Sequence, residues 1–346
     1  METLPWSWYH DADVLRLEQE RIFRRSWQYV GHADELAEAG DRLPAVAGQI
    51  PVVVLRDREG ALRAFLNVCR HRGFQVVRER GNGKSLQCGY HAWTYDLDGA
   101  LRAAPRSDRE PEFDSTGLGL LPLQVDTWGP FVFVNPDAEA APLADALGPV
   151  PELVAGLGLD VEALRFHHRS EFELEANWKL ACENFLECYH CAVAHPSLSD
   201  VLDVAPDAYR LESNGLTSSQ FGPLRATEEA EPFADGEVAR GQFHFVWPNL
   251  TVNIFPGRAN LSIGPALPVG PERTRRYLDY FFAEDVDEAW IGELLELDDQ
   301  VGREDAALVE GVQRGVRSGL LEHGLLMPRS EQLIGQFQRL TRTALS

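Results

Sequence analysis

The stretch from Asn177 to Pro196, N-W-K-L-A-C-E-N-F-L-E-C-Y-H-C-A-V-A-H-P, is the segment around which the chain is organised. Its spacing predicts a helix with Asn177 as N-cap. His190 and His195 are five residues apart, so they face one point only if the helix ends between them, and Pro196 prevents its continuation. The apolar face comprises Trp178, Ala181, Cys182, Phe185 and Tyr189, and the polar face comprises Asn184, Glu187 and His190.

Two histidines one turn after a carboxylate form part of a possible metal site. Two histidines and one carboxylate with open positions are the facial triad of non-haem Fe(II) oxygenases. The alternative is an amphipathic helix whose polar face meets water, and this segment alone leaves both open.

Composition excludes several other classes of protein. The chain has 346 residues, 44% hydrophobic and 25% charged, with a net charge of −22. This size allows two domains, and the charge argues against a nucleic-acid or anionic-membrane partner. No apolar run could span a membrane, and the N-terminus does not resemble a signal peptide, so a cytoplasmic location is predicted. Five cysteines make a disulfide scaffold unexpected; Cys182 is expected in the core, and Cys188 and Cys191 are assigned no chemistry.

The helical and strand patterns occupy different parts of the chain and predict an α+β protein. Residues 10–30 predict a helical arm, residues 41–135 predict short strands with hairpins at 57–60 and 96–99, and residues 138–151 suggest a linker. Four strands are expected between 242 and 282 and helices from Asp287 to the end. The predicted domains are 1–37, a helical arm on the catalytic domain; 38–150, a small all-β domain; and 151–346, an antiparallel-sheet catalytic domain.

A second motif lies in the β-rich part. Cys69 and His71 form C-x-H, and Cys88 and His91 follow as C-x-x-H. Two thiolates and two imidazoles are the ligands of a Rieske [2Fe–2S] cluster. A Cys₂His₂ zinc site would use the same atoms, but zinc fingers usually pair two cysteines and then two histidines.

Together the motifs C-R-H-R-G, C-G-Y-H-A-W-T-Y-D-L-D-G and N-W-K…E-N-F-L-E-C-Y-H…H-P resemble the catalytic α subunit of Rieske non-haem iron oxygenases. The resemblance implies a Rieske domain beside a helix-grip catalytic domain, a [2Fe–2S] cluster, a mononuclear Fe(II) and usually a homotrimer. It also implies electrons from a separate NAD(P)H-dependent reductase, in some systems through a ferredoxin. Gly89 and Ala92 depart from the family pattern, which has Pro and Gly there.

The third iron ligand is predicted to be Asp305. The resemblance implies a C-terminal aspartate, and Asp305 lies in the apolar stripe of its helix, where a carboxylate needs a partner or a metal. Asp298 is the alternative, although its place near the expected helix start would also explain it as a cap. Glu304 and Asp299 fall off the stripe.

The resemblance gives Glu187 a different role, that of the acidic residue linking an iron histidine to a cluster histidine of a neighbouring subunit. His91 is the expected cluster partner. A carboxylate between two imidazoles would orient both. The alternative is a surface glutamate.

The substrate prediction is the least constrained. The sequence E-C-Y-H-C resembles oxygenases of quaternary ammonium compounds such as carnitine, choline or glycine betaine, which favours N-demethylation or C–N cleavage; ring hydroxylation in aromatic hydrocarbon catabolism is the alternative. Aromatic side chains bind such cations by cation–π attraction. The proposed walls are Phe243, Phe245 and Trp247, then Tyr209 and Phe221, all of which could instead be core residues. A Rieske electron-transfer protein with a ligand-binding domain, and a zinc-stapled binding protein, remain from other classes.

Overall fold

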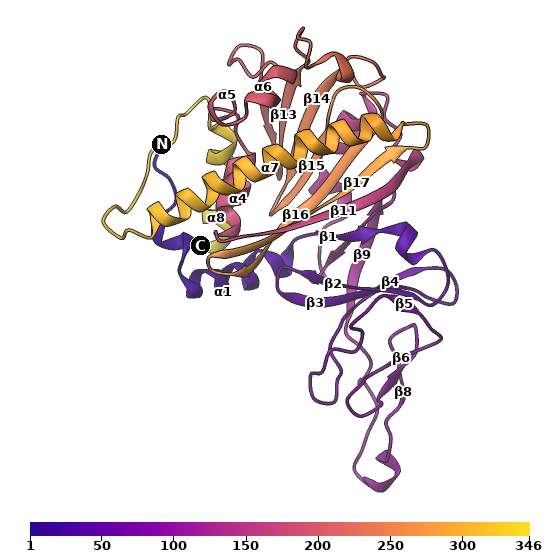
Figure 1. Cartoon of the computed structure of the whole chain (residues 1–346). Helices are drawn as coiled ribbons and strands as arrows, with labels where there is room; N and C mark the ends of the chain where they lie inside the picture. Colours follow the sequence, from indigo (N-terminus) through magenta and orange to yellow (C-terminus); the bar gives the residue numbers. More distant parts are fainter. The chain divides into compact units, whose positions relative to one another are not determined.

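The computed structural model describes residues 1–346, and these form two compact units (Figure 1). One unit contains Met1–Ile22 together with Ala144–Ser346, and the other contains Phe23–Leu143. The first 22 residues therefore belong with the C-terminal part of the chain, from Ala144 onward. The domain boundaries predicted from the sequence, at 37/38 and 150/151, differ from the limits of these units and remain a prediction.

The smaller unit is all-β, as predicted. Its main sheet is antiparallel with strand order β1-β10-β9-β4-β3-β2-β5, and a second sheet has order β6-β7-β8. The strands are β1 (Gln28–His32), β2 (Asp41–Ala47), β3 (Ile50–Arg56), β4 (Leu62–Leu66), β5 (Gly81–Asn82), β6 (Leu86–Gln87), β7 (Thr94–Tyr95), β8 (Leu101–Ala103), β9 (Pro122–Trp128) and β10 (Phe131–Asn135). The helical segments are η2 (Phe23–Arg25), η3 (Ala33–Leu36) and η4 (Ser107–Arg109).

The predicted hairpin between β3 and β4 is confirmed, and its turn is closed by Asp57. The Oδ1 atom of Asp57 accepts hydrogen bonds from the N–H groups of Glu59 and Ala61. Gly60 adopts a φ of 85°, a left-handed conformation that glycine reaches without strain. This turn brings β4 back along β3, and the C-terminal end of β4 leads directly to Cys69.

The larger unit contains a seven-stranded antiparallel sheet of order β11-β17-β16-β15-β14-β13-β12. Figure 1 shows the long helix α7 lying across this sheet, and one pocket is lined by residues of both. The strands are β11 (Leu164–Leu174), β12 (Arg210–Asn214), β13 (Thr217–Pro223), β14 (Arg240–Val246), β15 (Leu250–Ile254), β16 (Asn260–Gly270) and β17 (Arg273–Ala283).

Helices pack around this sheet, so the α+β, helix-grip prediction is confirmed. They are α1 (Ala12–Arg21), α2 (Leu143–Leu147), α3 (Val150–Ala155), α4 (Trp178–Phe185), α5 (Cys191–Ala194), α6 (Pro196–Val201), α7 (Glu288–Val316) and α8 (Gln332–Leu345). The short helices η1 (Trp6–Tyr9), η5 (Val161–Ala163) and η6 (Glu231–Phe233) complete the unit.

One row of side chains crosses the sheet on the face that α7 covers. Gln220 on β13 lies opposite Phe243 on β14, and Phe243 lies opposite Asn253 on β15. The row continues through Ser262 on β16 to Tyr280 on β17. Because directly opposed residues of an antiparallel sheet share a face, these side chains point to the same side. Four of the five line the pocket.

The N-terminal arm is fixed to α4 by a buried ion pair. Lys179 and Glu18 both have fully buried side chains, and Lys179 Nζ lies 2.5 Å from Glu18 Oε1. Lys179 also donates to the Trp8 carbonyl, and Trp178 Nε1 donates to Glu18 Oε2 at 2.8 Å. These contacts meet the demand that buried charges be paired and hydrogen-bonded.

We expect Glu183, on the same helix, to make stability depend on pH. Burial raises the pKa of Glu183 to about 7, although Gln338 and Tyr9 donate hydrogen bonds to its carboxylate. A raised carboxyl pKa stabilises the fold below the unfolded-state value of 4.5, and this contribution is lost as the pH rises through 7. The free energy of unfolding of Glu183→Gln should therefore rise relative to that of wild type as the pH increases from 5 to 8. Because the side chain keeps some exposure, we expect this relative increase to be about 1–2 kcal/mol.

Denaturant unfolding of both proteins at pH 5 and pH 8 measures this effect. Glu20→Gln, an exposed carboxylate on α1, is the matched control and should follow the wild-type pH profile. A constant difference between Glu183→Gln and wild type at the two pH values would contradict the prediction.

Two predictions about the chain were wrong. Residues 10–30 are not one helical arm, because α1 ends at Arg21 and Gln28–His32 form strand β1, which pairs with β10. Residues 138–151 are not a bare linker, since they contain α2 and the start of α3. In both segments pairing or packing with distant residues sets the structure, and local composition does not report such contacts.

Candidate active site

The turn after α4 positions the two predicted iron histidines. Helix α4 begins after Asn177, whose side chain caps it by accepting the Lys179 N–H, and it ends at Phe185. Glu187 Oε2 then accepts the backbone N–H groups of Tyr189 and His190, which closes the turn. The predicted helix break is present but misplaced: α4 already ends before His190, and His190 and His195 flank a separate short helix, α5.

Three side chains converge at this point. His195 Nε2 lies 2.9 Å from Asp305 Oδ1 and 3.0 Å from His190 Nε2, and His190 Nε2 lies 3.4 Å from the same carboxylate oxygen. Ligand atoms about 2.1 Å from one ion and at right angles to one another are about 3 Å apart. The three atoms therefore have the spacing of one face of an octahedron, which suits the facial triad of non-haem iron.

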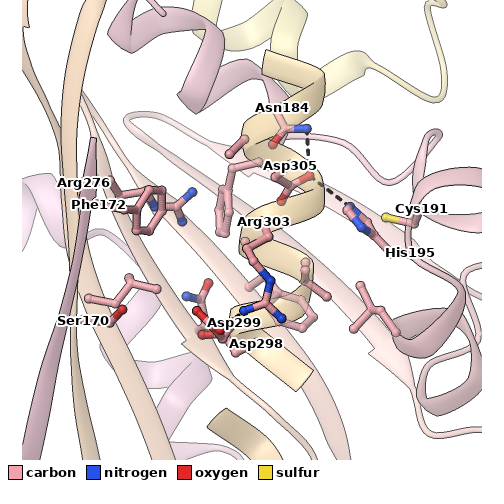
Figure 2. Close-up of a pocket in the computed structure, with 18 of the residues that line it drawn as sticks. Ser170, Phe172, Asn184, Cys191, His195, Arg276, Asp298, Asp299, Arg303 and Asp305 are labelled. Carbon is pink, nitrogen blue, oxygen red and sulfur yellow. Dashed lines mark hydrogen bonds and ion pairs between the residues drawn. The ribbon is translucent and has the colours of Figure 1, made fainter. Parts of the chain in front are cut away.

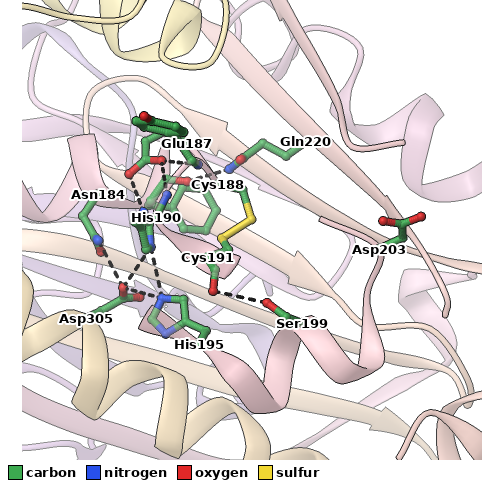
Figure 3. Close-up of a disulfide and its surroundings, with 12 residues drawn as sticks. Asn184, Glu187, Cys188, His190, Cys191, His195, Ser199, Asp203, Gln220 and Asp305 are labelled. Carbon is green, nitrogen blue, oxygen red and sulfur yellow. Dashed lines mark hydrogen bonds and ion pairs between the residues drawn. A yellow bond between two sulfur atoms is a disulfide. The ribbon is translucent and has the colours of Figure 1, made fainter. Parts of the chain in front are cut away.

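Carboxylates hold the opposite nitrogen of each ring. His190 Nδ1 is hydrogen-bonded to Glu187 Oε1, and His195 Nδ1 lies 2.8 Å from Glu304 Oε2 (Figure 3 shows the Glu187 contact). A ring that donates Nδ1–H to a carboxylate presents Nε2 as a ligand, the arrangement common around protein-bound metals. The histidine pair is thus oriented by residues of two separate segments.

The charges in this cluster shift one another strongly. Burial lowers the pKa of His190, but its hydrogen bonds to Asp305 and Glu187 outweigh burial and raise it to about 9. Burial likewise raises the pKa of Asp305, yet hydrogen bonds with His190 and His195 bring it below its ordinary value. Asn184 Nδ2 also donates to Asp305 Oδ1 at 3.1 Å (Figure 2). The carboxylate is therefore held ionised, as a metal ligand must be.

Helix α7 places two acidic residues, Asp298 and Glu304, differently from the sequence-based interpretation. Asp298 is not near the helix start, because α7 begins ten residues earlier at Glu288. Its Oδ2 accepts the Tyr280 hydroxyl, and burial raises the pKa of Asp298. Glu304, which the sequence placed off the stripe, reaches His195. Glu304 is rotated by about 100° from Asp305 around the helix axis, so it lies off the apolar stripe. Periodicity therefore gave no reason to select it, because its contact is with a residue of another segment.

A pocket of about 270 Å³ opens beside the three converging side chains (Figure 2). Its walls come from β11, β13, β14, β15 and β17 of the sheet and from α4 and α7. Its aromatic lining is Phe172, Phe185, Tyr209, Phe243, Phe255 and Tyr280, and its acidic lining is Glu171, Glu173, Glu187, Asp298, Asp299 and Asp305. The pocket thus combines aromatic faces with an excess of negative charge.

The predicted aromatic wall is only partly at the pocket. Phe243 lines it, but Phe245 and Trp247 pack against Phe337 of α8, with ring centroids 5.7 and 5.4 Å away. Phe243 and Phe245 do alternate along β14, Trp247 follows the end of that strand, and α8 covers Phe245 and Trp247 where the pocket ends. Tyr209 lines the pocket, whereas Phe221 lies between two arginines, Arg210 and Arg240.

Cysteines near the histidines also differ from the prediction. Cys188 and Cys191, which were assigned no chemistry, form a disulfide across the turn that carries His190 (Figure 3). The turn brings their Cα atoms to 4.9 Å, within the range that a disulfide requires. The bridge is local, so the chain is still not a disulfide scaffold. Cys182 is a buried free thiol, as predicted.

The Rieske-type motifs of the smaller unit form two loops of the same design. In each loop the N–H of the cysteine donates to the carbonyl five residues later, from Cys69 to Phe74 and from Cys88 to Trp93, at 2.8 Å. The carbonyl of the cysteine accepts the N–H four residues later, that of Gly73 or Ala92, at 3.0 Å. The thiols of Cys69 and Cys88 are buried, while His71 and His91 are exposed with ring centroids 4.6 Å apart. Two thiols inside and two imidazoles outside fit a cluster with two cysteines on one iron and two histidines on the other.

Tyr95 adds a hydrogen bond to one of the thiols. Its hydroxyl oxygen accepts the Arg70 N–H at 2.9 Å and lies 3.2 Å from Cys69 Sγ. The hydroxyl hydrogen is therefore free to donate to the sulfur. Hydrogen bonds to the sulfur ligands are one of the means by which a protein sets the potential of a cluster.

We expect Ala92→Gly to stabilise the second loop. The fourth residue after each cysteine has a left-handed conformation, with φ of 75° at Gly73 and 58° at Ala92. This conformation strains alanine by about 1–2 kcal/mol, and the greater freedom of glycine in the unfolded chain offsets part of the gain. The net stabilisation should be about 0.5–1 kcal/mol, measured by denaturant unfolding followed at the cluster absorption.

Gly73→Ala is the reciprocal control. No atom lies within 4 Å of a Cβ built at Gly73, so only backbone strain would act, and we expect destabilisation of similar size. Destabilisation by Ala92→Gly would show that the alanine methyl contributes packing that exceeds its strain.

Comparison with known proteins agrees with this geometry. The family models that match are "Rieske [2Fe-2S] domain" over residues 26–122 and "Ring hydroxylating alpha subunit (catalytic domain)" over residues 161–346. The carnitine monooxygenase oxygenase subunit of Acinetobacter pittii (strain PHEA-2) is 34% identical over 93% of this chain and 92% of its own. The chloroplastic choline monooxygenase of Arabidopsis thaliana is 32% identical over 93% of this chain and 78% of its own.

Solved structures show the same relationship. The quaternary ammonium Rieske monooxygenase CntA superposes with a TM-score of 0.87 at 32% identity, covering 100% of this chain and 96% of that one. Naphthalene 1,2-dioxygenase from Rhodococcus sp., at 22% identity and a TM-score of 0.81, shares the fold.

The chain belongs to the ring-hydroxylating α-subunit family of Rieske non-haem iron oxygenases. It is therefore an oxygenase with a [2Fe–2S] cluster and a mononuclear iron, and the predicted class and cofactors are confirmed. None of its helices is both long and apolar enough to cross a membrane.

Proposed function

We propose that this oxygenase oxidises a small quaternary ammonium compound at a carbon bound to nitrogen. The observation that carries the proposal is the pocket beside His190, His195 and Asp305, which is lined by aromatic rings and an excess of carboxylates. Aromatic faces attract quaternary ammonium groups, which offer no hydrogen bond donor. The names of the carnitine and choline monooxygenase relatives support the same substrate class.

His190, His195 and Asp305 are the proposed iron ligands, and Cys69, His71, Cys88 and His91 are the proposed cluster ligands. The iron supplies oxygen activation and the cluster supplies an electron. Glu187 and Glu304 accept the Nδ1–H groups and keep each Nε2 atom directed at the metal position. Asn184 fixes the Asp305 carboxylate from the other side.

The proposed reaction is N-demethylation or cleavage of another C–N bond. One oxygen atom of O₂ enters a C–H bond beside nitrogen, and the other leaves as water with two electrons and two protons. The resulting hemiaminal breaks its C–N bond, which releases a tertiary amine, an aldehyde and a proton. The chain's residues bind the cation and exclude water from this site.

The proposed assembly is a homotrimer served by a separate NAD(P)H-dependent reductase, with or without a ferredoxin. Within it, Glu187 would link His190 to His91 of the partner subunit. The support is the placement of Glu187, whose carboxylate is already hydrogen-bonded to His190 Nδ1 while the side chain remains partly exposed.

A reductase-coupled assay tests the substrate class. Carnitine, choline and betaines are compared with benzoate and biphenyl, with NADH consumption and product measured together. We expect coupled formation of an aldehyde from at least one amine. Coupled hydroxylation of a ring compound, with no product from any amine, would overturn the proposal in favour of ring hydroxylation.

A further inference from the structure

Arg276 is a cation in the pocket wall without an anionic partner. It lies on β17 opposite Phe172 of β11, and it is half-buried. Its guanidinium carbon is 6.0 Å from the ring centroids of both Phe172 and Phe185. Its one hydrogen bond is a long contact of 3.5 Å to Thr251 Oγ1, and none of the ion pairs of the chain includes it. A half-buried guanidinium that lies near two phenylalanine rings and has only one long hydrogen bond can accept an anionic ligand as its partner.

The neighbouring arginines show what Arg276 lacks. Arg169 on β11 donates two hydrogen bonds to Asp279, at 2.6 and 2.7 Å, and stacks on Tyr277. Arg303, the other pocket arginine, is exposed and paired with Asp299. Asp298 is near enough to Arg276 for the two charges to attract, but its hydrogen bond is with Tyr280 and no ion pair forms.

A second set of unpaired groups faces the same pocket from other strands. Gln220 and Asn253 are 3% and 4% exposed, and Gln220 Oε1 and Asn253 Oδ1 have no donor. The orientation of Gln220 is set, since its Nε2 donates to the Phe185 carbonyl. Both residues lie beside Phe243 in the cross-strand row. A quaternary ammonium group spreads its charge over its methyl groups. It can therefore bind between two buried carbonyl oxygens, through C–H···O contacts, and against an aromatic face, through cation–π attraction.

We propose that the substrate is a zwitterion, whose quaternary ammonium group sits on Phe243 between Gln220 and Asn253 and whose carboxylate is bound by Arg276. This inference rests on the proposed function and narrows it. An amino alcohol such as choline would leave Arg276 without an acceptor. Sequence similarity does not make this distinction, because the carnitine and choline enzymes are 34% and 32% identical to the chain.

The test compares two ligands that differ only in the anionic end, γ-butyrobetaine and its methyl ester. Dissociation constants are measured by calorimetry on the anaerobic, iron-loaded enzyme without reductase. We expect wild type to bind the zwitterion at least about tenfold more tightly than the ester, since hydrogen bonds between charged groups are strong. In Arg276→Gln the two constants should agree within about twofold.

Two further variants complete the design. Arg303→Gln removes the other pocket arginine and should leave the zwitterion-to-ester ratio as in wild type, whatever it does to affinity. Arg276→Lys keeps the charge but not the planar fork, so its ratio should fall between those of wild type and Arg276→Gln. It also provides a second test if the glutamine variant does not fold.

The possible failures are distinguishable. If neither ligand binds and ring compounds are oxidised, the proposed function is wrong. If both ligands bind wild type equally, or if Arg276→Gln keeps the wild-type preference, the substrate class stands and the role of Arg276 is wrong. A turnover assay with both ligands adds a check, because loss of the anchor should raise KM for the zwitterion more than for the ester.

Discussion

Asp305→Ala is expected to abolish oxygenation and remove the mononuclear iron while leaving the [2Fe–2S] cluster in place. Asp305 supplies the one anionic atom among three converging side chains, with Oδ1 at 2.9 Å from His195 Nε2 and 3.4 Å from His190 Nε2. Without it, two neutral imidazoles would have to hold the ion alone. The cluster motifs lie in the other compact unit, so their ligands are unchanged.

Metal analysis and visible spectroscopy together measure this outcome. Wild type should contain about three irons and two acid-labile sulfides per chain, and the variant about two of each. Glu296→Ala, an exposed carboxylate on the same helix, is the matched control and should match wild type in both iron content and activity. Full iron content in Asp305→Ala would remove Asp305 from the ligand set, and stoichiometric zinc without visible absorbance would contradict both metal assignments.

The sequence predicted that one continuous helix could not carry both His190 and His195, because proline and helical geometry are local constraints, but it misplaced the break, which precedes His190. It also predicted Asp305 as a ligand through the periodicity of one helix, and the structure places that carboxylate against both histidines. The same method could not find Glu304, which contacts His195 from a segment more than 100 residues away along the chain. Periodicity assigns a residue to a face of its own element, and the neighbour of that face is set by the tertiary fold.

The aromatic residues of β14 show the same limit. Phe243 and Phe245 share a face of β14, as their alternation requires, and Trp247 follows the strand's end; α8 packs against Phe245 and Trp247, and only Phe243 lines the pocket. Arg276 had no sequence signal at all. Arg276 was selected because it lacks an anionic partner, and this can be recognised only when the surroundings of the side chain are known.

Glu187→Gln is expected to slow electron transfer between the metal centres while both metals remain bound. Glu187 Oε1 is hydrogen-bonded to His190 Nδ1, and Oε2 accepts the N–H groups of Tyr189 and His190. The amide keeps one acceptor oxygen and the side-chain length, so His190 should stay oriented. It loses the negative charge and the second acceptor, which the proposed link to an imidazole of the partner subunit requires.

Single-turnover kinetics separate these effects. The reduced enzyme is mixed with O₂ and substrate, and reoxidation of the cluster is followed by absorbance. We expect the rate to fall about 10–100-fold, the usual effect of replacing a residue that orients a metal ligand, with iron content unchanged. Glu183→Gln, which alters a carboxylate on α4 that contacts neither histidine, is the control for general effects on this segment. Wild-type reoxidation in Glu187→Gln would exclude Glu187 as the link, and full activity in a monomer would exclude transfer between subunits, because a single chain would then carry the electron from its own cluster to its own iron.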